Sequence, residues 1–357
     1  MLRKFLFVLV AVAAAGLAVF YWTTRPLPIL TVTSWAGPYG RAQAVAQMRT
    51  YASAHHVDVH LAQWDGDLSG IKGDVIDLEL PGAVEACHRG LLEKIDAGDL
   101  PPGDDGAPAG QDFVPGASGP CWIGSIVYSQ IIAFAPNFPN GTPTTLGDFF
   151  DPVKFPGGRA LKRGSGKYNL ELALLADGVA PKDVYPTLST GPGLARALHK
   201  LDSLKPDLVW YDKDSEALPL LRDGGAAFAT VLNGQFYDAV QSGAGKDIGA
   251  IWDRQLYELD VFGIPAGDRQ KSTALDYISF ATGAKPLAGV ASWVPYGPAR
   301  RSAWPLVGKN PELGTDMNPF LPTAHFGTAF SVDDEWWRAH GARIALAWQN
   351  WLANPAH

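Results

Sequence analysis

Residues 30–40 read Leu-Thr-Val-Thr-Ser-Trp-Ala-Gly-Pro-Tyr-Gly, and this stretch decides the fold class. Its β-branched half predicts a short strand, and its Gly/Pro-rich half predicts a loop that carries Trp35 and Tyr39. Open α/β sheets bind ligands in the loops that follow the carboxyl ends of their strands. Two aromatic side chains at such a position favour capture of a solute over catalysis.

The N-terminal segment 1–28 resembles an export signal. Arg3 and Lys4 precede an uncharged run from Phe5 to Trp22. The small residues 13–15 suit a cleaved signal peptide. The uncharged run 5–22 is also long enough to remain as an inner-membrane anchor. Either way, we expect the rest of the chain to lie outside the cytoplasm, in the periplasm.

About 330 residues remain, which corresponds to about two domains. The net charge of −7 and the lack of a basic stripe give no indication of nucleic-acid binding. Cys87 and Cys121 are the only cysteines, and in an exported chain they predict one disulfide. Neither has a histidine in a recognisable partner pattern, so a catalytic role is disfavoured.

Strand-like and helix-like patterns alternate along the chain, which predicts an α/β fold with a mainly parallel sheet. Asp77 and Glu79 alternate with apolar residues in Asp74–Leu80, so both carboxylates belong to one face of a strand. A solvated sheet edge explains that alternation equally well. The expected strands are 30–33, 57–61, 74–80, 123–135, 208–211, 226–232 and 259–264, and the expected helices are 40–55, 84–90, 145–150, 170–177, 193–204, 215–222, 273–282 and 336–352.

Seven short motifs occur in an order that resembles the solute-binding proteins of ABC transporters, of the spermidine/putrescine-binding type. Each motif is weak alone, but together they span nearly the whole mature chain. They are Ser34-Trp-Ala-Gly-Pro-Tyr39, Gly73-Asp-Val-Ile-Asp77, Gly124-Ser-Ile-Val-Tyr128, Thr145-Leu-Gly-Asp-Phe149, Ala229-Thr-Val-Leu-Asn-Gly234, Leu259-Asp-Val-Phe-Gly-Ile-Pro265 and Val294-Pro-Tyr296.

The resemblance implies a two-lobed periplasmic-binding-protein fold, type II-like, with a ligand cleft between the lobes. We expect residues 29–133 and 261–302 to form lobe 1, and residues 134–260 and 303–357 to form lobe 2. Lobes of this kind close about a hinge. The implied partners are a small solute and a membrane permease, and we expect a monomer without a cofactor.

The resemblance also implies residue roles. Trp35 and Tyr39 match the first binding loop of the family, Tyr296 an aromatic wall, and Asp260 an acidic residue that pairs with a ligand amine. Aromatic faces attract ammonium groups by about 0.5–2 kcal/mol. Glu258 precedes Asp260 by one strand period and would share its face if the strand continues back to residue 258. Asn233 is primarily a turn residue, with a ligand hydrogen bond as the alternative reading.

One segment departs from the polyamine binders. Where they carry acidic residues at the start of a helix, this chain has Arg163-Gly-Ser-Gly-Lys-Tyr168. Ser165, Lys167 and backbone N–H groups at a helix N-terminus form an anion site. We therefore expect a ligand with an amine end facing Asp260 and an anionic end facing Ser165–Lys167, either polyamine-like or an amino-acid derivative. A solvated surface turn is the alternative.

Enzyme functions find little support in the sequence. It has no Gly-x-Ser-x-Gly elbow and no His-Glu-x-x-His motif, and its two cysteines are too far apart in the sequence for a zinc motif. We therefore expect no catalytic or metal site. The alternatives to an importer component are a membrane-anchored solute sensor and an exported hydrolase on a similar fold.

Overall fold

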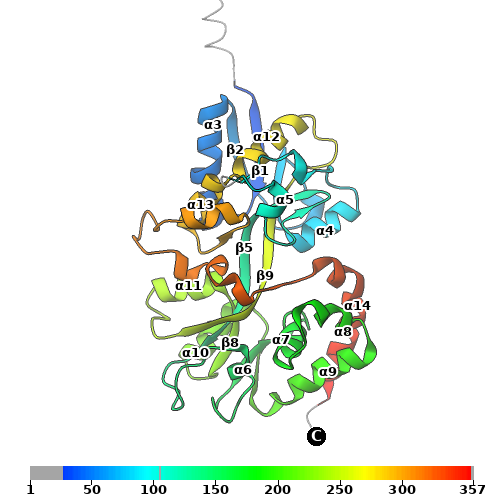
Figure 1. Ribbon diagram of the computed structural model, residues 1–357, viewed down its shortest axis with the longest axis vertical. Helices are drawn as coiled ribbons and strands as arrows, with labels where there is room; N and C mark the ends of the chain where they lie inside the picture. Colours follow the sequence, from blue (N-terminus) through cyan, green and yellow to red (C-terminus); the bar gives the residue numbers. More distant parts are fainter. Residues whose placement is uncertain (1–26, 104–105, 355–357) are drawn as a thin grey trace, which may run out of the picture.

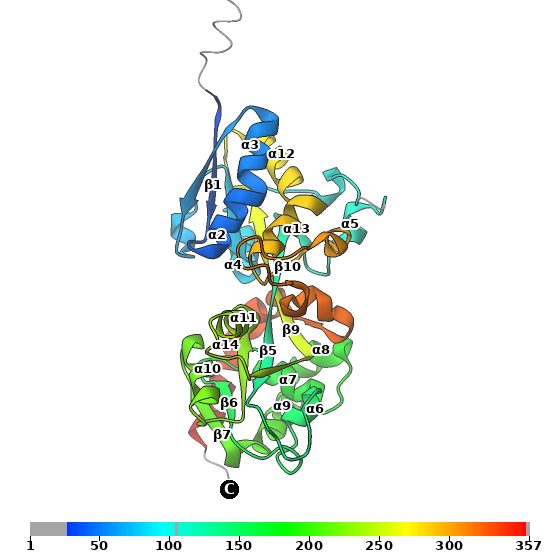
Figure 2. The same cartoon turned by 90° about the vertical axis from the view of Figure 1, so that its left-hand side faces the viewer.

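The computed structural model describes residues 27–103 and 106–354, and the predicted export segment lies outside them except for its last two residues. Two lobes lie one above the other and are joined by two long strands, as Figures 1 and 2 show. This confirms the predicted two-lobed α/β fold. No helix in the described part of the chain is both long and apolar enough to cross a bilayer.

A single sheet runs through both lobes in the strand order β2-β1-β3-β9-β5-β8-β6-β7, with β10 and β4 paired to β5 and β11 to β9. Its strands are β1 Ile29–Ser34, β2 Asp58–Gln63, β3 Val75–Glu79, β4 Ser118–Gly119, β5 Trp122–Phe134, β6 Arg159–Lys162, β7 Leu208–Tyr211, β8 Phe228–Leu232, β9 Gly249–Gly263, β10 Gly297–Pro298 and β11 Phe330–Ser331.

The centre of this sheet corrects the expectation of mainly parallel pairing. Pairing is parallel at the two ends, between β1 and β2 and between β6 and β7. The central pairs β3–β9, β5–β9 and β5–β8 are antiparallel. The reason is that β5 carries the chain from lobe 1 to lobe 2 and β9 carries it back, so the two crossover strands run in opposite directions.

Helices cover the sheet in each lobe. Those of lobe 1 are α2 Pro38–Gln43, α3 Arg49–His55, α4 Leu80–His88, α5 Ala109–Asp112, α12 Lys271–Ala281 and α13 Ala284–Trp293. Those of lobe 2 are α6 Leu146–Phe149, α7 Asn169–Ala176, α8 Val184–Leu188, α9 Gly191–Asp202, α10 Asp214–Arg222, α11 Asn233–Gln241 and α14 Asp334–Ala353. The helix predicted over 40–55 contains a π-helical stretch, Ala44–Met48, between α2 and α3.

Each lobe has its own hydrophobic core. One large cluster gathers apolar residues of β1, β3, α4 and the lobe-1 half of β9. A second gathers α7, α9, α14 and the lobe-2 half of β5. A smaller cluster joins Leu287 and Ala291 of α13 to Tyr237 of α11 through Met317 and Leu321. The stretch 303–321, which we assigned to lobe 2, therefore packs on both lobes, and the lobe boundaries remain a proposal.

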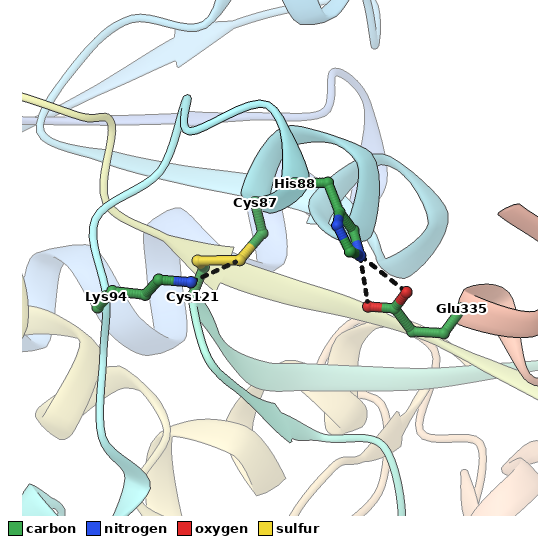
Figure 3. The surroundings of a disulfide bond; sticks show 5 residues. All are labelled: Cys87, His88, Lys94, Cys121 and Glu335. Atoms are coloured by element: carbon green, nitrogen blue, oxygen red, sulfur yellow. Dashed lines mark hydrogen bonds and ion pairs between the residues drawn. A yellow bond between two sulfur atoms is a disulfide. The ribbon is translucent and has the colours of Figure 1, made fainter. Parts of the chain in front are cut away.

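The predicted disulfide between Cys87 and Cys121 is present (Figure 3), and it joins the end of α4 to the residue before β5. Closing a loop of about 35 residues in the unfolded chain stabilises a protein by roughly 3–4 kcal/mol in the chain-entropy model. The neighbouring side chain, His88, lies within 2.9 and 3.1 Å of the two carboxylate oxygens of Glu335 on α14. This contact joins the two lobes.

Candidate ligand-binding site

The floor of the interlobe cleft is one face of the central strands. The register pairs Glu79 of β3 with Asp260 of β9, and Asp260 and Glu258 with Ile126 and Tyr128 of β5. Partners in an antiparallel ladder, and residues two apart on one strand, share a face. The fold therefore brings Glu79, Glu258 and Asp260 together on one face. Alternation along each strand relates Glu258 to Asp260, but the pairing of Glu79 with Asp260 comes from the tertiary structure.

Aromatic side chains form the wall of the cleft. Trp35 follows β1 and lies against Trp64, with 5.6 Å between ring centroids. Tyr39, at the start of α2, meets Tyr296 edge to face at 5.8 Å. A cavity of about 310 Å³ opens beside them, and its lining also includes Glu79. The remaining lining residues are Ala36, Pro38, Gly234, Tyr237, Asp238, Trp293, Val294 and Pro295.

Asp77 lies beneath this wall. It is fully buried, and its Oδ2 accepts hydrogen bonds from Tyr39 Oη at 2.8 Å and from Gln43 Nε2. Ser34 Oγ lies 3.2 Å away. Burial raises the pKa of Asp77 to about 7 despite these donors. In this conformation Asp77 supports Tyr39 from behind, and Tyr39 contacts the cleft.

Asp260 lies beside Glu79 on the cleft face of β9. It is only 6% exposed and is not itself one of the residues that line the cavity. Burial and the charges of Asp77, Glu79 and Glu258 raise the pKa of Asp260 well above its ordinary value. The Trp35 indole N–H is buried and has no well-aligned hydrogen-bond partner among the described residues, although it lies close enough to lower the pKa of Asp260. No described lysine, arginine or histidine forms an ion pair with Asp260.

Glu258 has partners of its own. Lys167 Nζ and the Tyr168 hydroxyl both donate to its carboxylate. Lys167 also binds Asp334 Oδ1 of α14 at 2.8 Å. These two carboxylates raise the pKa of Lys167 although burial opposes the shift. The positive charge of Lys167 is thus already balanced in this conformation.

Ser165 and Asn233, the other two predicted ligand residues, form hydrogen bonds within the protein. Ser165 is exposed and its Oγ accepts the backbone N–H of Lys167 at 3.0 Å. Asn233 is fully buried. Its amide accepts from Ser129 N at 2.9 Å and donates to Pro295 O at 2.6 Å. Asn233 therefore ties the start of α11 to β5 and to the segment that leads into β10.

Several residues that contact the predicted ligand residues or line the cavity were not identified from the sequence. Tyr168 and Asp334 complete the Lys167 cluster, and Tyr237, Asp238 and Trp293 line the cavity. Tyr168 adopts φ 70° and ψ −49°, a rare and strained backbone conformation for a residue other than glycine. Its position beside Lys167 was the only signal in the sequence. Among the described residues, no group of three or more His, Cys, Asp or Glu side chains is arranged to hold a metal ion.

A second hollow lies on the opposite face of the crossover strands. This rear groove measures about 780 Å³ and is mostly apolar, with Tyr257, Leu80 and Trp122 in its lining. Tyr257 alternates with Glu258, so its side chain leaves the other face of β9. The rear groove is larger than the cleft cavity. Of its charged residues, Asp334 and Glu335 are paired, and Lys182 and Asp333 are exposed to solvent. The cleft, with the buried and unpaired Asp260, is therefore the candidate ligand site.

The fold and the cleft define a two-lobed solute-binding protein. The chain belongs to the bacterial extracellular solute-binding protein family, whose model matches residues 45–315. It is 30% identical over 335 residues to a gamma-aminobutyric acid-binding protein of Pseudomonas aeruginosa, covering 91% of each chain. The relatives found in these comparisons are substrate-binding proteins and not enzymes.

Solved structures agree with this family. A GABA receptor is 27% identical, with a TM-score of 0.68, and the match covers 92% of this chain and 98% of that one. A spermidine/putrescine substrate-binding protein from Streptococcus pneumoniae has a TM-score of 0.69 over 91% of this chain and 99% of its own, but only 13% identity. That second likeness shows the fold alone, so the spermidine/putrescine type stays a prediction.

Proposed function

We propose that this protein is the solute-binding component of an ABC importer and captures a small amine-containing solute between its lobes. The observation that carries the proposal is Asp260, a buried carboxylate without an ion-pair partner on the floor of an aromatic-walled cleft. A buried charge is costly unless it is paired. A ligand ammonium group supplies the missing partner, and Trp35 and Tyr296 offer their ring faces to it.

The class of solute includes polyamine-like compounds and amino-acid derivatives. The relatives named for gamma-aminobutyric acid support the second group, since that molecule has an ammonium at one end and a carboxylate at the other. The predicted anionic end would face Ser165 and Lys167. Because Lys167 is held by Glu258 and Asp334, an anion can bind it only by displacing one of these carboxylates or by joining them.

The family relationship supports the remaining parts of the proposal. We propose that the protein acts as a monomer in the periplasm and delivers its solute to a membrane permease. Closure of the lobes about β5 and β9 would bury the solute and present a new surface to that permease.

A thermal-shift screen tests this function. We expect gamma-aminobutyrate or putrescine to raise the melting temperature by a few degrees, since a ligand at 100 times its Kd stabilises by about 2.7 kcal/mol. Acetate and glucose serve as solutes without an amine. Trp35→Ala should weaken binding of the active amine about tenfold, and Lys182→Ala, at the exposed edge of the rear groove, should leave it unchanged. A screen in which no amine stabilises the protein contradicts the proposal.

A further inference from the structure

Two carboxylates of the cleft face each other directly. Glu79 and Asp260 are register partners in the antiparallel β3–β9 pair. Such partners have Cβ atoms about 5 Å apart on the same face, and like charges at these positions destabilise a sheet. None of the ion pairs formed within the described residues involves either carboxylate. The fold thus keeps a repulsive pair without neutralising it.

The nearby cations are engaged elsewhere. Lys167 binds Glu258 and Asp334, and Lys162 binds Asp214 at 2.7 Å. The ionisable groups that face the carboxylate pair are mostly acids and phenols. They are Asp77 of β3, Glu258 of β9, Tyr39 of α2, Tyr128 of β5 and Tyr296, together with Tyr237 and Asp238 of α11 and Lys162, Lys167, Tyr168 and Asp214 from lobe 2.

The two carboxylates differ in depth. Asp260 is only 6% exposed, whereas Glu79 ends its strand in contact with solvent and lines the aromatic cavity. A solute that reaches Asp260 therefore passes Glu79 and the rings of Trp35 and Tyr296. The cavity beside Glu79 is an independent sign that this position receives a ligand.

We propose that Glu79 and Asp260 form one two-carboxylate socket for the cationic head of the solute. This inference rests on the proposed function and narrows its substrate class. A terminal ammonium or guanidinium group fits between two carboxylates. An α-amino acid carries its own carboxylate beside the ammonium, so it brings a third negative charge into the socket. The socket selects terminal amines and rejects α-amino acids, because specificity depends on repulsion as well as attraction.

The socket also links binding to protons. Two carboxylates that share a site do not ionise together readily. Burial raises the pKa of both residues, with further increases from Asp77, Glu79 and Glu258 at Asp260 and from Glu258 at Glu79. We therefore expect the empty socket to take up a proton more readily than a socket that holds a cation, so that binding of the cation favours proton release. Affinity for amines falls as pH falls, because protonated carboxyls do not attract a cation.

Isothermal titration calorimetry with two isomers tests the socket. The probes are 4-aminobutyrate and 2-aminobutyrate, which contain the same atoms but carry the ammonium on the terminal carbon and beside the carboxylate, respectively. Butylamine serves as a cation without a carboxylate. We expect 4-aminobutyrate and butylamine to bind, and 2-aminobutyrate to bind at least tenfold more weakly. Titrations near pH 7 in two buffers of different ionisation enthalpy should reveal proton release.

Glu79→Gln is the decisive variant because its side chain is exposed and its loss does not threaten folding. We expect Glu79→Gln to reduce the discrimination between the isomers at least threefold and to lower the proton release. Glu312→Gln, an exposed carboxylate paired with Arg41 outside the cavity, should match the wild type in both respects.

The possible failures are distinguishable. If 4-aminobutyrate or butylamine binds but Glu79→Gln leaves discrimination and proton release unchanged, the socket is wrong and the solute-binding function survives. Equal binding of the two isomers by the wild type also overturns the socket alone. If no amine binds the wild type between pH 6 and 9, the proposed function and the socket fall together.

Discussion

The two faces of the crossover strand β9 differ in chemistry although their side chains alternate along one strand. Glu258 and Asp260 face the cleft, and Tyr257 faces the rear groove. The rear groove has about 780 Å³ and the cleft cavity about 310 Å³. The rear groove has apolar walls, and its charged residues are either paired or exposed, whereas the cleft has a buried carboxylate without an ion pair. Buried unpaired charge, and not volume, is therefore the basis on which we propose the cleft as the ligand site.

The faces are also related through β5 and β9, the two strands that join the lobes. The rear side carries a contact between lobes, His88 with Glu335 (Figure 3). If the lobes close about these strands as we propose, closure on the cleft side would change the spacing on the rear side. We therefore expect substitutions in the cleft to change affinity strongly, and those at the rear to change it weakly through the balance between open and closed forms.

The largest expected effect on affinity is at Asp260. Asp260→Asn should weaken binding of an amine solute about 30-fold or more, because removal of one member of a buried charge pair costs about 2 kcal/mol or more. Tyr257→Phe, three residues earlier on the opposite face, removes a 3.3 Å hydrogen bond to Pro115 O and an interaction with Ser331 and should stay within twofold. Calorimetric titration of both variants checks the contrast. Equal losses would remove the distinction between the faces.

The disulfide should contribute a free energy of unfolding similar in size to the free energy of binding contributed by Asp260. The double variant Cys87→Ser/Cys121→Ser should lose about 3 kcal/mol of unfolding free energy in urea, with an unchanged Kd for the amine. A dithiol reductant should destabilise the wild type and leave the double variant unaffected. A change in Kd above threefold would mean that the disulfide holds the cleft and not only the lobe-1 core.

Asp77 provides a pH-dependent test. Its folded pKa of about 7 exceeds the ordinary value of about 4, so the folded state binds more protons than the unfolded state between these pH values. Proton uptake by Asp77 therefore stabilises the folded state at low pH. That stabilisation is lost as pH rises across this window, and it does not change further above it. The free energy of unfolding should therefore favour Asp77→Asn over the wild type more strongly at pH 8 than at pH 4. We expect this difference to be on the order of 1–3 kcal/mol.

Melting temperatures of Asp77→Asn and wild type at pH 4, 6 and 8 provide the measurement. Asparagine retains an oxygen that accepts from Tyr39 and Gln43, so the binding loop should keep its position. Ligand affinity at pH 8 is the control for that position. A stability difference that does not vary with pH would show that Asp77 does not take up a proton on folding.

The smallest effect belongs to the rear contact. Glu335→Gln removes a half-exposed partner of His88 and Arg338, and such surface pairs contribute less than about 1 kcal/mol. We expect less than a threefold change in affinity, measured by titration with the same amine. A tenfold gain would show that the His88–Glu335 contact holds the lobes open far more strongly than a surface pair does.

Sequence patterns predicted much of the molecule. The strand at 30–33, the alternation around Asp77, the disulfide and the Trp-rich C-terminal helix depend on local patterns or on the only available cysteine pairing. The sequence pattern did not predict the first part of β9. The strand begins at residue 249, ten residues before the strand predicted from residue 259. The segment mixes Trp, Asp, Arg and Gln, and its extended form comes from pairing with β5.

The sequence by itself determined which chemical groups this protein carries and which of them share a strand face, because strand periodicity is local. The burial and ion pairing of each of these groups depend on the tertiary structure. Asp77 is covered by Tyr39 and Gln43 of α2, whereas Glu79, one strand period later, reaches solvent. Lys167 neutralises Glu258 and leaves Asp260 unpaired. Burial and charge pairing depend on segments far apart in the chain, so no local pattern contains them.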